Sequence, residues 1–262
     1  FTLDPATGKY HFDASHAAYN HLNQGDQEVI TVKVIAQDNH QGEAHSTIQL
    51  TVTGTNDAPV ASSSNYTHKL DEGSPQLLGQ VVATDADNSQ LTYSIAAGAN
   101  TPAGFKLAGN GSYTFDPSHS AYNHLAVGEH QDLTIPVTIS DGHNIIHSKI
   151  SITINGTNDT PTVNAKTETV DEGNGVLNGH LSAQDQDHGD TVEFTLKPGT
   201  QAPDGFTLRP DGSYSFDPDH ASYNSLAEKD STTLHIDIIA TDNNGAKVPT
   251  TLSITINGTN DQ

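Results

Sequence analysis

The stretch Leu133-Thr-Ile-Pro-Val-Thr-Ile-Ser-Asp-Gly142 decides the fold, because its apolar residues occupy every second position. The same alternation returns in Ile150-Ser-Ile-Thr-Ile-Asn-Gly-Thr-Asn-Asp159. A period of two places successive side chains on opposite faces of a β-strand, so one face can be buried while the other meets water. Similar stretches run over residues 30–36, 48–52, 192–196, 234–240 and 252–256. We therefore predict an all-β fold of antiparallel two-sheet β-sandwiches, with short strands separated by Gly, Asn and Asp turns.

The chain is built from an internal repeat. The string Gly-Thr-Asn-Asp begins at Gly54, Gly156 and Gly258, so the repeat is 102 residues long, the size of one small domain. Three modules follow: the C-terminal half of one repeat over residues 1–57, and complete repeats over 58–159 and 160–262. The one helical turn expected in each repeat covers residues 117–125 and its counterparts. Its Tyr122 and Leu125 are expected to close the end of the core.

Charge and composition limit the function. With 32 acidic and 10 basic residues, the net charge of −22 argues against nucleic acid or an anionic membrane surface as a partner and favours cations. The chain has no cysteine, so disulfides and thiolate metal sites are excluded. No apolar run approaches the ~20 residues of a membrane span. Phosphate-loop, Gly-x-Ser-x-Gly and His-Glu-x-x-His motifs are absent, and we expect no enzymatic activity.

Acidic and amide side chains recur where predicted strands end and where repeats meet. Such hard oxygen ligands suit Ca²⁺, whereas Zn²⁺ would want His or Cys. Several carboxylates held together without a cation repel one another. A solvated acidic turn, or an Asx turn ahead of a proline, would explain the same residues without a metal. The recurring positions are Glu72 and Glu172; the pairs Asp85, Asp87 and Asp185, Asp187; Asp38, Asp141 and Asp242; and the linker pairs Asn56, Asp57, Asn158, Asp159, Asn260 and Asp261.

Histidine is abundant, with 15 residues, but most of its recurring positions lie on the predicted helical turn. We interpret these histidines as surface or capping residues and not as metal ligands. They are His16, His21, His119, His124 and His220.

Four motifs, in this order within a repeat, carry a resemblance to a known family. They are Val-Asp-Glu-Gly at 170–173, Ala-Thr-Asp-Ala-Asp at 83–87, Ile-Ser-Asp-Gly at 139–142 and Gly-Thr-Asn-Asp-x-Pro at 54–59. As a set they resemble the cadherin-like and VCBS repeats found in tandem in large bacterial adhesins of the repeats-in-toxin (RTX) class. The resemblance covers the whole chain. It implies immunoglobulin-like or cadherin-like sandwiches in an extended array, with Ca²⁺ bound between successive repeats.

The resemblance also implies which residues hold the calcium, and these are carried over by position. The first junction would use Asp26, Asn56, Asp57, Asp85, Asp87 and Asp141. The second would use Glu72, Glu129, Asn158, Asp159, Asp185, Asp187 and Asp242. Half of a third site would comprise Glu172, Asp230, Asn260 and Asp261. The cadherin element Leu-Asp-x-Glu is reduced here to its last acid, at 26, 129 and 230, which leaves the number of ions per junction open. Asp116, Asp190 and Asp217 are not included in the set.

Two functions follow from this resemblance. The first is a calcium-rigidified spacer of a bacterial cell-surface adhesin that supports adhesion and biofilm formation, exported by type I secretion and monomeric, with neighbouring repeats as its partners through calcium. The second is a sandwich that binds a carbohydrate or a protein directly. Exposed aromatic residues would favour the second, yet the chain has no Trp and its Tyr and Phe recur at positions expected in the core.

Overall fold

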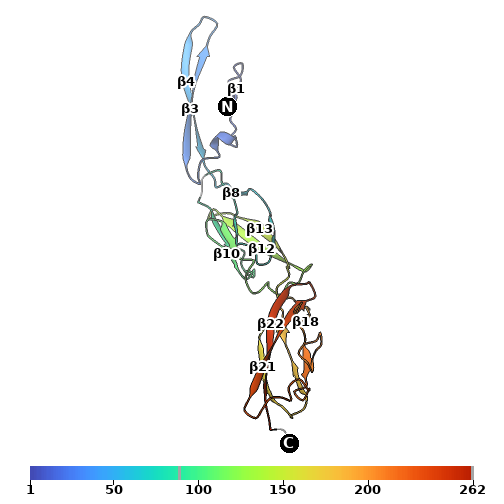
Figure 1. Ribbon diagram of the computed structural model, residues 1–262. Helices are drawn as coiled ribbons and strands as arrows, with labels where there is room; N and C mark the ends of the chain where they lie inside the picture. Colours follow the sequence, from blue (N-terminus) through green and yellow to red (C-terminus); the bar gives the residue numbers. More distant parts are fainter. Residues whose placement is uncertain (88–89, 261–262) are drawn as a thin grey trace. The chain divides into compact units, whose positions relative to one another are not determined.

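A computed structural model describes residues 1–87 and 90–260 of the chain (Figure 1). Within these residues the secondary structure is β-strand, apart from a short 3₁₀-helix, η1 (Ala17–Tyr19), so the prediction of an all-β fold is confirmed. The half-repeat, residues 1–57, contains β1 (Thr2–Leu3), β2 (Tyr10–His11), β3 (Gln27–Gln37) and β4 (Glu43–Thr53).

The two complete repeats contain corresponding series of strands. The first series is β5 (Val60–Ala61), β6 (Tyr66–Asp71), β7 (Leu77–Gln80), β8 (Ala83–Thr84), β9 (Thr92–Ile95), β10 (Phe105–Leu107), β11 (Ser112–Phe115), β12 (His130–Ser140) and β13 (Ile145–Asn155). The second is β14 (Thr162–Val163), β15 (Lys166–Asp171), β16 (Leu177–His180), β17 (Ala183–Gln184), β18 (Val192–Leu196), β19 (Phe206–Leu208), β20 (Ser213–Phe216), β21 (Ser231–Asp242) and β22 (Lys247–Asn257).

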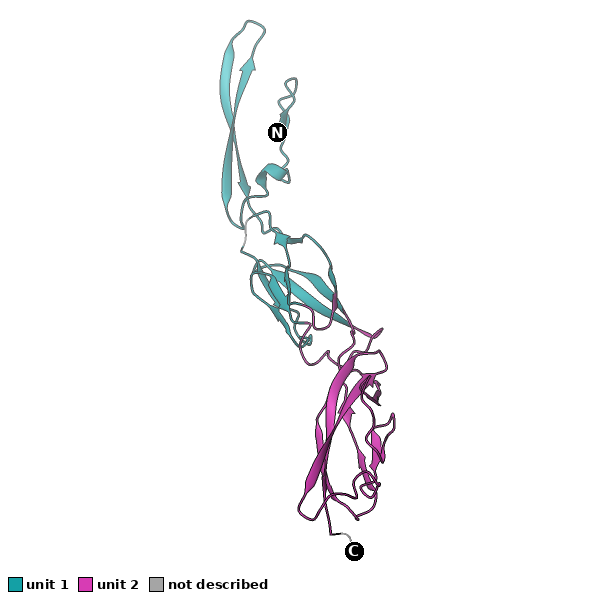
Figure 2. Ribbon diagram, in the orientation of Figure 1, with its two compact units in different colours: residues 1–69, 75–116, 132–153 teal, residues 70–74, 117–131, 154–262 magenta. Residues whose placement is uncertain are grey.

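The chain divides into two compact units whose limits differ from those of the repeats (Figure 2). Unit 1 comprises residues 1–69, 75–116 and 132–153, and unit 2 comprises 70–74, 117–131 and 154–262. Unit 2 therefore joins the end of the second repeat in sequence to the whole of the third. Each candidate site described below lies within a single unit.

Unit 2 contains a complete β-sandwich. One sheet has the order β15-β22-β21-β18, in which β15 runs parallel to β22 and the other pairs are antiparallel. The second sheet has the order β16-β20-β19. The alternating residues of β21 and β22 supply the centre of the core, as the period of two predicts. Ile236, Ile238, Leu252, Ile254 and Ile256 are all fully buried.

The second repeat forms matching sheets, with the orders β6-β13-β12-β9 and β10-β11-β7. Its central strands bury the equivalent side chains, among them Ile135, Ile139, Ile150 and Ile154, at 0% exposure. The same alternating pattern therefore produces the same core in both complete repeats.

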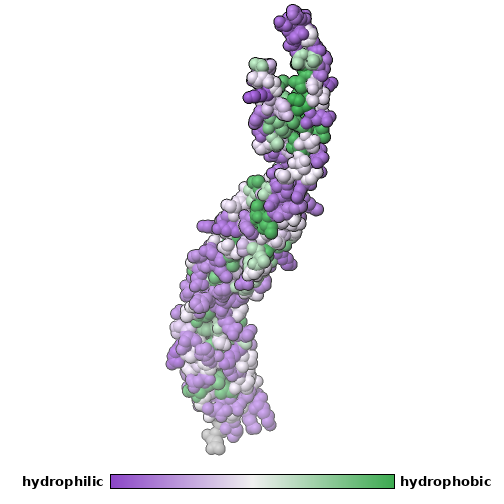
Figure 3. Space-filling model, turned by 180° about the vertical axis from the view of Figure 1, so that it is seen from behind, coloured by the Kyte–Doolittle hydropathy of each residue, from purple (hydrophilic) through white to green (hydrophobic). Residues whose placement is uncertain are grey.

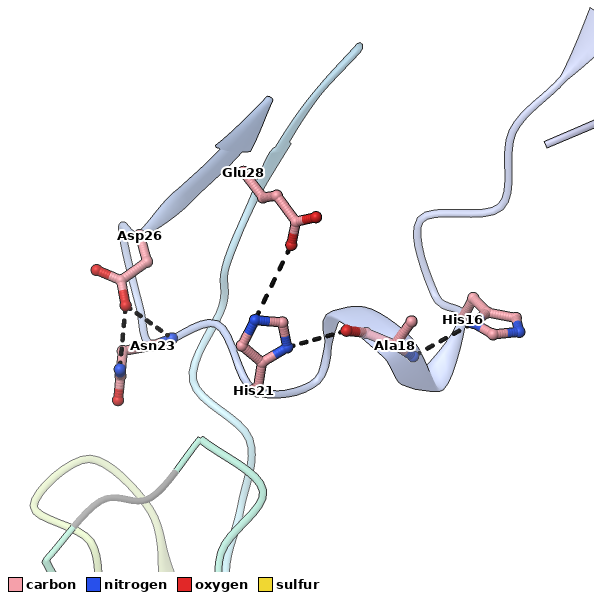
Figure 4. Close-up of polar contacts among 6 residues, drawn as sticks. All are labelled: His16, Ala18, His21, Asn23, Asp26 and Glu28. Carbon is pink, nitrogen blue, oxygen red and sulfur yellow. Dashed lines mark hydrogen bonds and ion pairs between the residues drawn. The ribbon is translucent and has the colours of Figure 1, made fainter. Parts of the chain in front are cut away.

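The predicted helical turn is a series of hydrogen-bonded turns in the complete repeats and contains η1 in the half-repeat. Tyr122 and Leu125 are buried, which confirms their place in the core. A histidine caps each turn: the backbone N–H of Ala18 donates to His16 Nδ1 at 3.2 Å (Figure 4). His119 and His220 accept the same bond, from Ala121 and Ser222. The capping role is therefore confirmed for His16, His119 and His220, three of the five histidines for which a surface or capping role was predicted.

The half-repeat has an incomplete sheet. Strands β3 and β4 pair with each other over eleven positions, and within the described residues neither has another partner. Their counterparts β12 and β13 are the inner strands of a four-stranded sheet. Ile48 is therefore partly exposed, whereas its counterpart Ile150 is fully buried. Figure 3 shows hydrophobic surface on the part of the chain that holds this hairpin.

Two glycines in the sandwiches make room for tyrosine rings. A Cβ added at Gly79 would overlap the ring of Tyr113, and one added at Gly179 would overlap the ring of Tyr214. Both tyrosines are buried, at 3% and 2% exposure, and cannot move into solvent without opening the core. These close approaches explain why glycine occupies the same position of β7 and β16.

We expect Gly79→Ala to lower the free energy of unfolding by about 1–3 kcal/mol, because the added methyl group overpacks the core against Tyr113. Urea unfolding followed by circular dichroism measures the change. Gly109→Ala is the matched control, since its Cβ would meet no atom within 4 Å; it should change stability by less than about 0.5 kcal/mol. Equal effects of the two substitutions would contradict the overlap.

Candidate cation-binding site

The larger of two acidic clusters lies in unit 2 and is named linker cluster 2. Its carboxylates follow strand ends: Glu72 comes directly after β6, Asp185 and Asp187 come after β17, and Asp242 ends β21. The linker residues Asn158 and Asp159 follow β13. Strand ends gather at the ends of a sandwich, so residues distant in sequence meet here. Linker cluster 2 comprises Glu72, Asn158, Asp159, Asp185, Asp187 and Asp242.

Hydrogen bonds attach the linker to the strand ends. The backbone N–H of Asp159 donates to Asp187 Oδ2 at 2.8 Å, and Asn158 Nδ2 donates to Asp242 Oδ2 at 2.9 Å. On the other side, the backbone N–H of Thr157 donates to Glu72 Oε1 at 2.7 Å. The structure thus brings these predicted ligands together around residues 157–159.

Several oxygens of linker cluster 2 are buried and accept no hydrogen bond from the described residues. They are Glu72 Oε2, Asn158 Oδ1, Asp159 Oδ2, Asp185 Oδ2 and Asp187 Oδ1. Glu72 and Asp187 are only 6% and 4% exposed, so water reaches them poorly. A buried polar atom without a partner costs about 1–3 kcal/mol, and more when it is charged. As metal ligands these groups offer only oxygen atoms, most of them from carboxylates. Such a set fits a hard divalent cation such as Ca²⁺.

The pKa shifts of these carboxyl groups also favour a bound cation. Burial raises the pKa of Glu72, with smaller contributions from the nearby charges of Asp159 and Asp187. Burial also raises the pKa of Asp159 and of Asp187, and Asp185 adds to both shifts by repulsion. In each case the environment disfavours the charged form, which a bound cation would stabilise.

Asp242 differs from its neighbours. Burial alone would raise its pKa, but hydrogen bonds from Asn158 and from backbone N–H groups outweigh burial and lower it. Among these bonds, Asn244 N and Ala246 N donate to Oδ1 at 2.9 Å each. Asp242 is therefore held ionised by the turn that follows β21.

Linker cluster 1, in unit 1, repeats this arrangement and comprises Asn56, Asp57, Asp85, Asp87 and Asp141. Asn56 Nδ2 donates to Asp141 Oδ2 at 2.9 Å, and Asp57 N donates to Asp87 Oδ2 at 3.3 Å. Asp87 is 1% exposed, and Asp85 Oδ2 is buried without a hydrogen bond from the described residues. The bond from Asn56, together with backbone N–H groups, lowers the pKa of Asp141 to about 2. The same residues therefore converge in both repeats.

The carboxylates of Asp26 and Glu129 have local partners. Asp26 Oδ2 accepts hydrogen bonds from the backbone and side-chain nitrogens of Asn23, at 3.2 and 3.0 Å (Figure 4). Glu129 Oε2 accepts from Ala126 N at 3.1 Å, and its Oε1 faces His188. Asp230 occupies the same backbone turn. No hydrogen bond within the described residues connects any of the three carboxylates to a linker cluster, and their role as calcium ligands stays a prediction.

Of the residues predicted for a third half-site, Glu172 and Asp230 lie beside residues 258–259, to which their backbone carbonyls are hydrogen-bonded. Glu172 is 6% exposed, and neither of its carboxylate oxygens accepts a hydrogen bond from the described residues. Asn260 is exposed after β22. Asp261, the remaining member, lies outside the described residues. Glu172, like Glu72, is therefore a buried carboxylate with oxygen atoms that accept no hydrogen bond. Within the described residues it has no group of acidic neighbours like the one around Glu72.

One further acid joins linker cluster 2. Carboxylate oxygens of Asp185, Asp187 and Asp190 lie within 4.8 Å of one another, close enough to share an ion. The amides of Asn243 and Asn244 donate to the two oxygens of Asp190, at 3.1 and 2.9 Å, and orient it. Asp190 was not part of the ligand set predicted from the sequence. The spacing Asp-x-Asp-x-x-Asp over residues 185–190 was the available signal.

A pH dependence follows from Asp85. Burial is the main cause that raises its pKa, to about 6 from an ordinary 3.8. A carboxyl group whose pKa is higher in the folded chain contributes stability below its unfolded pKa, and this contribution is lost as the pH rises through about 6. In chelator we therefore expect the melting temperature to rise as the pH falls from neutrality to about 5.

The variant D85N isolates this effect, because an amide does not titrate in that range. Differential scanning calorimetry in chelator compares the two proteins at each pH. The difference between them should shrink as the pH falls. An unchanged difference from neutrality to about pH 5 would show that Asp85 is not the group responsible.

Comparison with known proteins identifies the domain type. Residues 56–156 and 158–258 each match the sequence model of the bacterial cadherin-like domain. No curated protein matches the chain. Together with the observed sheets, the two matches confirm the prediction of tandem cadherin-like β-sandwiches.

Solved structures of cadherins resemble the chain. Human protocadherin-24 EC1-2 is 16% identical, with a TM-score of 0.48 over 79% of this chain and 100% of that one. Drosophila N-cadherin EC1-4 is 14% identical, with a TM-score of 0.48 over 91% of this chain. PcdhgB3 EC1-4 is 17% identical, with a TM-score of 0.50 over 89%. The chain spans 59% and 58% of the latter two structures. At this identity the PcdhgB3 likeness indicates the fold alone.

Across the described residues, none of the helical structure has the length and apolar character needed to cross a bilayer.

Proposed function

Because this chain belongs to the family of bacterial cadherin-like domains, we propose that it is a calcium-stiffened spacer of a bacterial cell-surface adhesin. Tandem cadherin-like domains are extracellular modules related to adhesion, and they are typically not enzymes. The observation that carries the calcium proposal is the set of buried, unsatisfied oxygens at the linkers. Among the described residues, every such oxygen except Thr250 Oγ1 belongs to a predicted calcium ligand.

Calcium would act on the linker itself. In linker cluster 2 it would draw together Glu72, the linker residues Asn158 and Asp159, and the strand-end acids Asp185 and Asp187. These residues come from two separate stretches of unit 2, residues 70–74 and 154–262. A shared cation would replace repulsion between them with attraction and restrict the backbone of residues 157–159. The function would therefore consist in resistance to bending, and not in recognition by a pocket.

The expected affinity suits an extracellular setting. Extracellular calcium modules have dissociation constants of about 10⁻⁴–10⁻³ M. Millimolar calcium outside the cell would fill such sites, whereas cytosolic calcium would leave them empty. We propose that the chain stays pliable inside the cell and stiffens after export. Glu172 with Asp230, Asn260 and Asp261 would contribute to a further site of the same kind.

Small-angle X-ray scattering in chelator and in millimolar calcium tests the spacer function. Calcium should narrow the distribution of interatomic distances and reduce flexibility. The double variant D185A/D187A should lose part of this response, because linker cluster 1 still responds. D237N is the control, because Asp237 contacts Lys197 and Thr251 and no member of either cluster. Equal flexibility of the unsubstituted chain with and without calcium would rule out the proposed function.

A further inference from the structure

A hollow on the surface of unit 2 is lined by three histidines that the calcium proposal does not use, together with Glu129, which makes no hydrogen bond to linker cluster 2 within the described residues. Its walls are His124, Leu125, Gly128, Glu129, His130 and His188. Three imidazoles and one carboxylate thus surround one open space. They come from two segments: residues 124–130, which end at the first residue of β12, and the loop that follows β17.

Hydrogen bonds hold the two segments together at this hollow. The backbone N–H of His188 donates to the carbonyl of His124 at 3.0 Å. Beside it, Asn123 Nδ2 donates to Gln186 Oε1 at 3.1 Å. The backbones that carry His124 and His188 are therefore fixed next to each other.

The carboxylate is already oriented toward an imidazole. Glu129 Oε2 accepts the Ala126 backbone N–H, which leaves Oε1 at 3.9 Å from His188 Nδ1. The side chain of His188 is 78% exposed and can turn about its χ angles without disturbing the core. The rings of His124 and His130 make no hydrogen bond to any described residue, so they too are available.

We propose that this hollow binds a divalent transition-metal ion of the Zn²⁺ type through His188, Glu129 and the imidazoles of His124 and His130. Imidazole nitrogen with one carboxylate oxygen is a ligand set that Zn²⁺ prefers, whereas Ca²⁺ takes oxygen ligands. In the structure His188 Nδ1 and Glu129 Oε1 lie 3.9 Å apart, and the exposed rings of His124 and His130 would turn toward them on binding the ion. Zinc and calcium would thus occupy separate, neighbouring sites of unit 2.

Comparison of the repeats shows that this ligand set is particular to one place. The positions of His124, Glu129 and His130 are occupied by His21, Asp26 and Gln27 in the half-repeat, and by Ser225, Asp230 and Ser231 in the third repeat. The position of His188 is occupied by asparagine in the second repeat. The complete set is therefore no general property of the repeat, and the other copies supply natural replacements for each histidine.

Isothermal titration of the full chain with zinc chloride, in saturating calcium, tests this proposal. The variants are H188N, which copies the second repeat; E129Q, which can still accept the Ala126 bond; and H124S/H130S, which copies the third repeat. H147Q is the control, because His147 is an exposed histidine of β13 in unit 1. D187N shows whether zinc instead enters linker cluster 2. Circular dichroism establishes that each variant is folded.

We expect one zinc ion per chain, an affinity weakened by more than about tenfold in each of the three hollow variants, and no change in H147Q or D187N. The proposal is overturned if the unsubstituted chain binds no stoichiometric zinc. It is also overturned if H188N, E129Q or H124S/H130S keeps the unsubstituted affinity, or if D187N loses it. None of these outcomes depends on whether calcium stiffens the chain.

Discussion

In about 50 mM calcium, well above the expected dissociation constant, the variant D187N is expected to melt at a lower temperature than the unsubstituted chain, and in chelator at a higher one. The reversal follows from the surroundings of Asp187. It is 4% exposed, its Oδ1 accepts no hydrogen bond from the described residues, and Asp159, Asp185 and Asp190 all repel its charge. Without a cation the negative charge of Asp187 lowers the stability of the folded chain. When a cation is bound, the carboxylate becomes one of its ligands.

The two effects differ in size. An amide at position 187 keeps an oxygen for the Asp159 backbone N–H and removes a buried charge, which should stabilise the chain in chelator by about 1 kcal/mol. With dissociation constants of about 10⁻⁴–10⁻³ M, calcium at about 50 mM is in roughly fifty- to five-hundredfold excess over the dissociation constant and stabilises the folded state by about 2–4 kcal/mol. D187N should lose most of this contribution at linker cluster 2. Whether D187N raises or lowers the melting temperature therefore depends on whether calcium is bound.

Differential scanning calorimetry of both proteins, with and without calcium, measures the reversal. D237N serves as the control for loss of one negative charge, since Asp237 is half-exposed and pairs with Lys197 at 3.4 Å. It should shift the melting temperature equally in both buffers. If D187N destabilised the chain by the same amount with and without calcium, Asp187 would be a structural residue and not a ligand.

The second large effect concerns the core. Ile150→Ala should lower the free energy of unfolding by about 2–5 kcal/mol, because it empties a fully buried site between two sheets. Urea unfolding with a linear extrapolation gives the change, provided that the m-value stays constant.

Ile48→Ala is the matched substitution in the half-repeat. Ile48 occupies the same position of the repeat but is partly exposed on the β3–β4 hairpin. Its loss should cost about 1 kcal/mol or less. Equal losses at the two positions would mean that the face of the β3–β4 hairpin is covered in solution. A smaller loss of stability at Ile48 would mean that the alternation of apolar residues does not by itself produce a buried core.

Much of the site could be predicted because its residues recur. Each complete repeat contains the same acidic pair and follows the same linker pair, first seen as Asp85, Asp87 and Asn56, Asp57. In both copies the backbone N–H of the linker aspartate donates to the second acid of the acidic pair. Asp26, Glu129 and Asp230 recur too, yet Asp26 and Glu129 bind nitrogens of the turn beside them. Recurrence locates a residue but does not show which way its side chain points. Asp190 was left out of the predicted set for the converse reason: no second copy marks it. Its spacing from Asp185 and Asp187 was a weak signal, which the short distance among the three carboxylates supports.

By itself the sequence determined the all-β fold, the length of the repeat and the core positions. These depend on the alternation of apolar residues along single strands, which is a local property. Only the tertiary structure decided which oxygens are buried without a partner, which carboxylates converge at the linkers, and where the compact units begin and end. Those features depend on residues far apart in the chain, such as Glu72, Asp159 and Asp187, whose distances are set when strand ends from different sheets pack together.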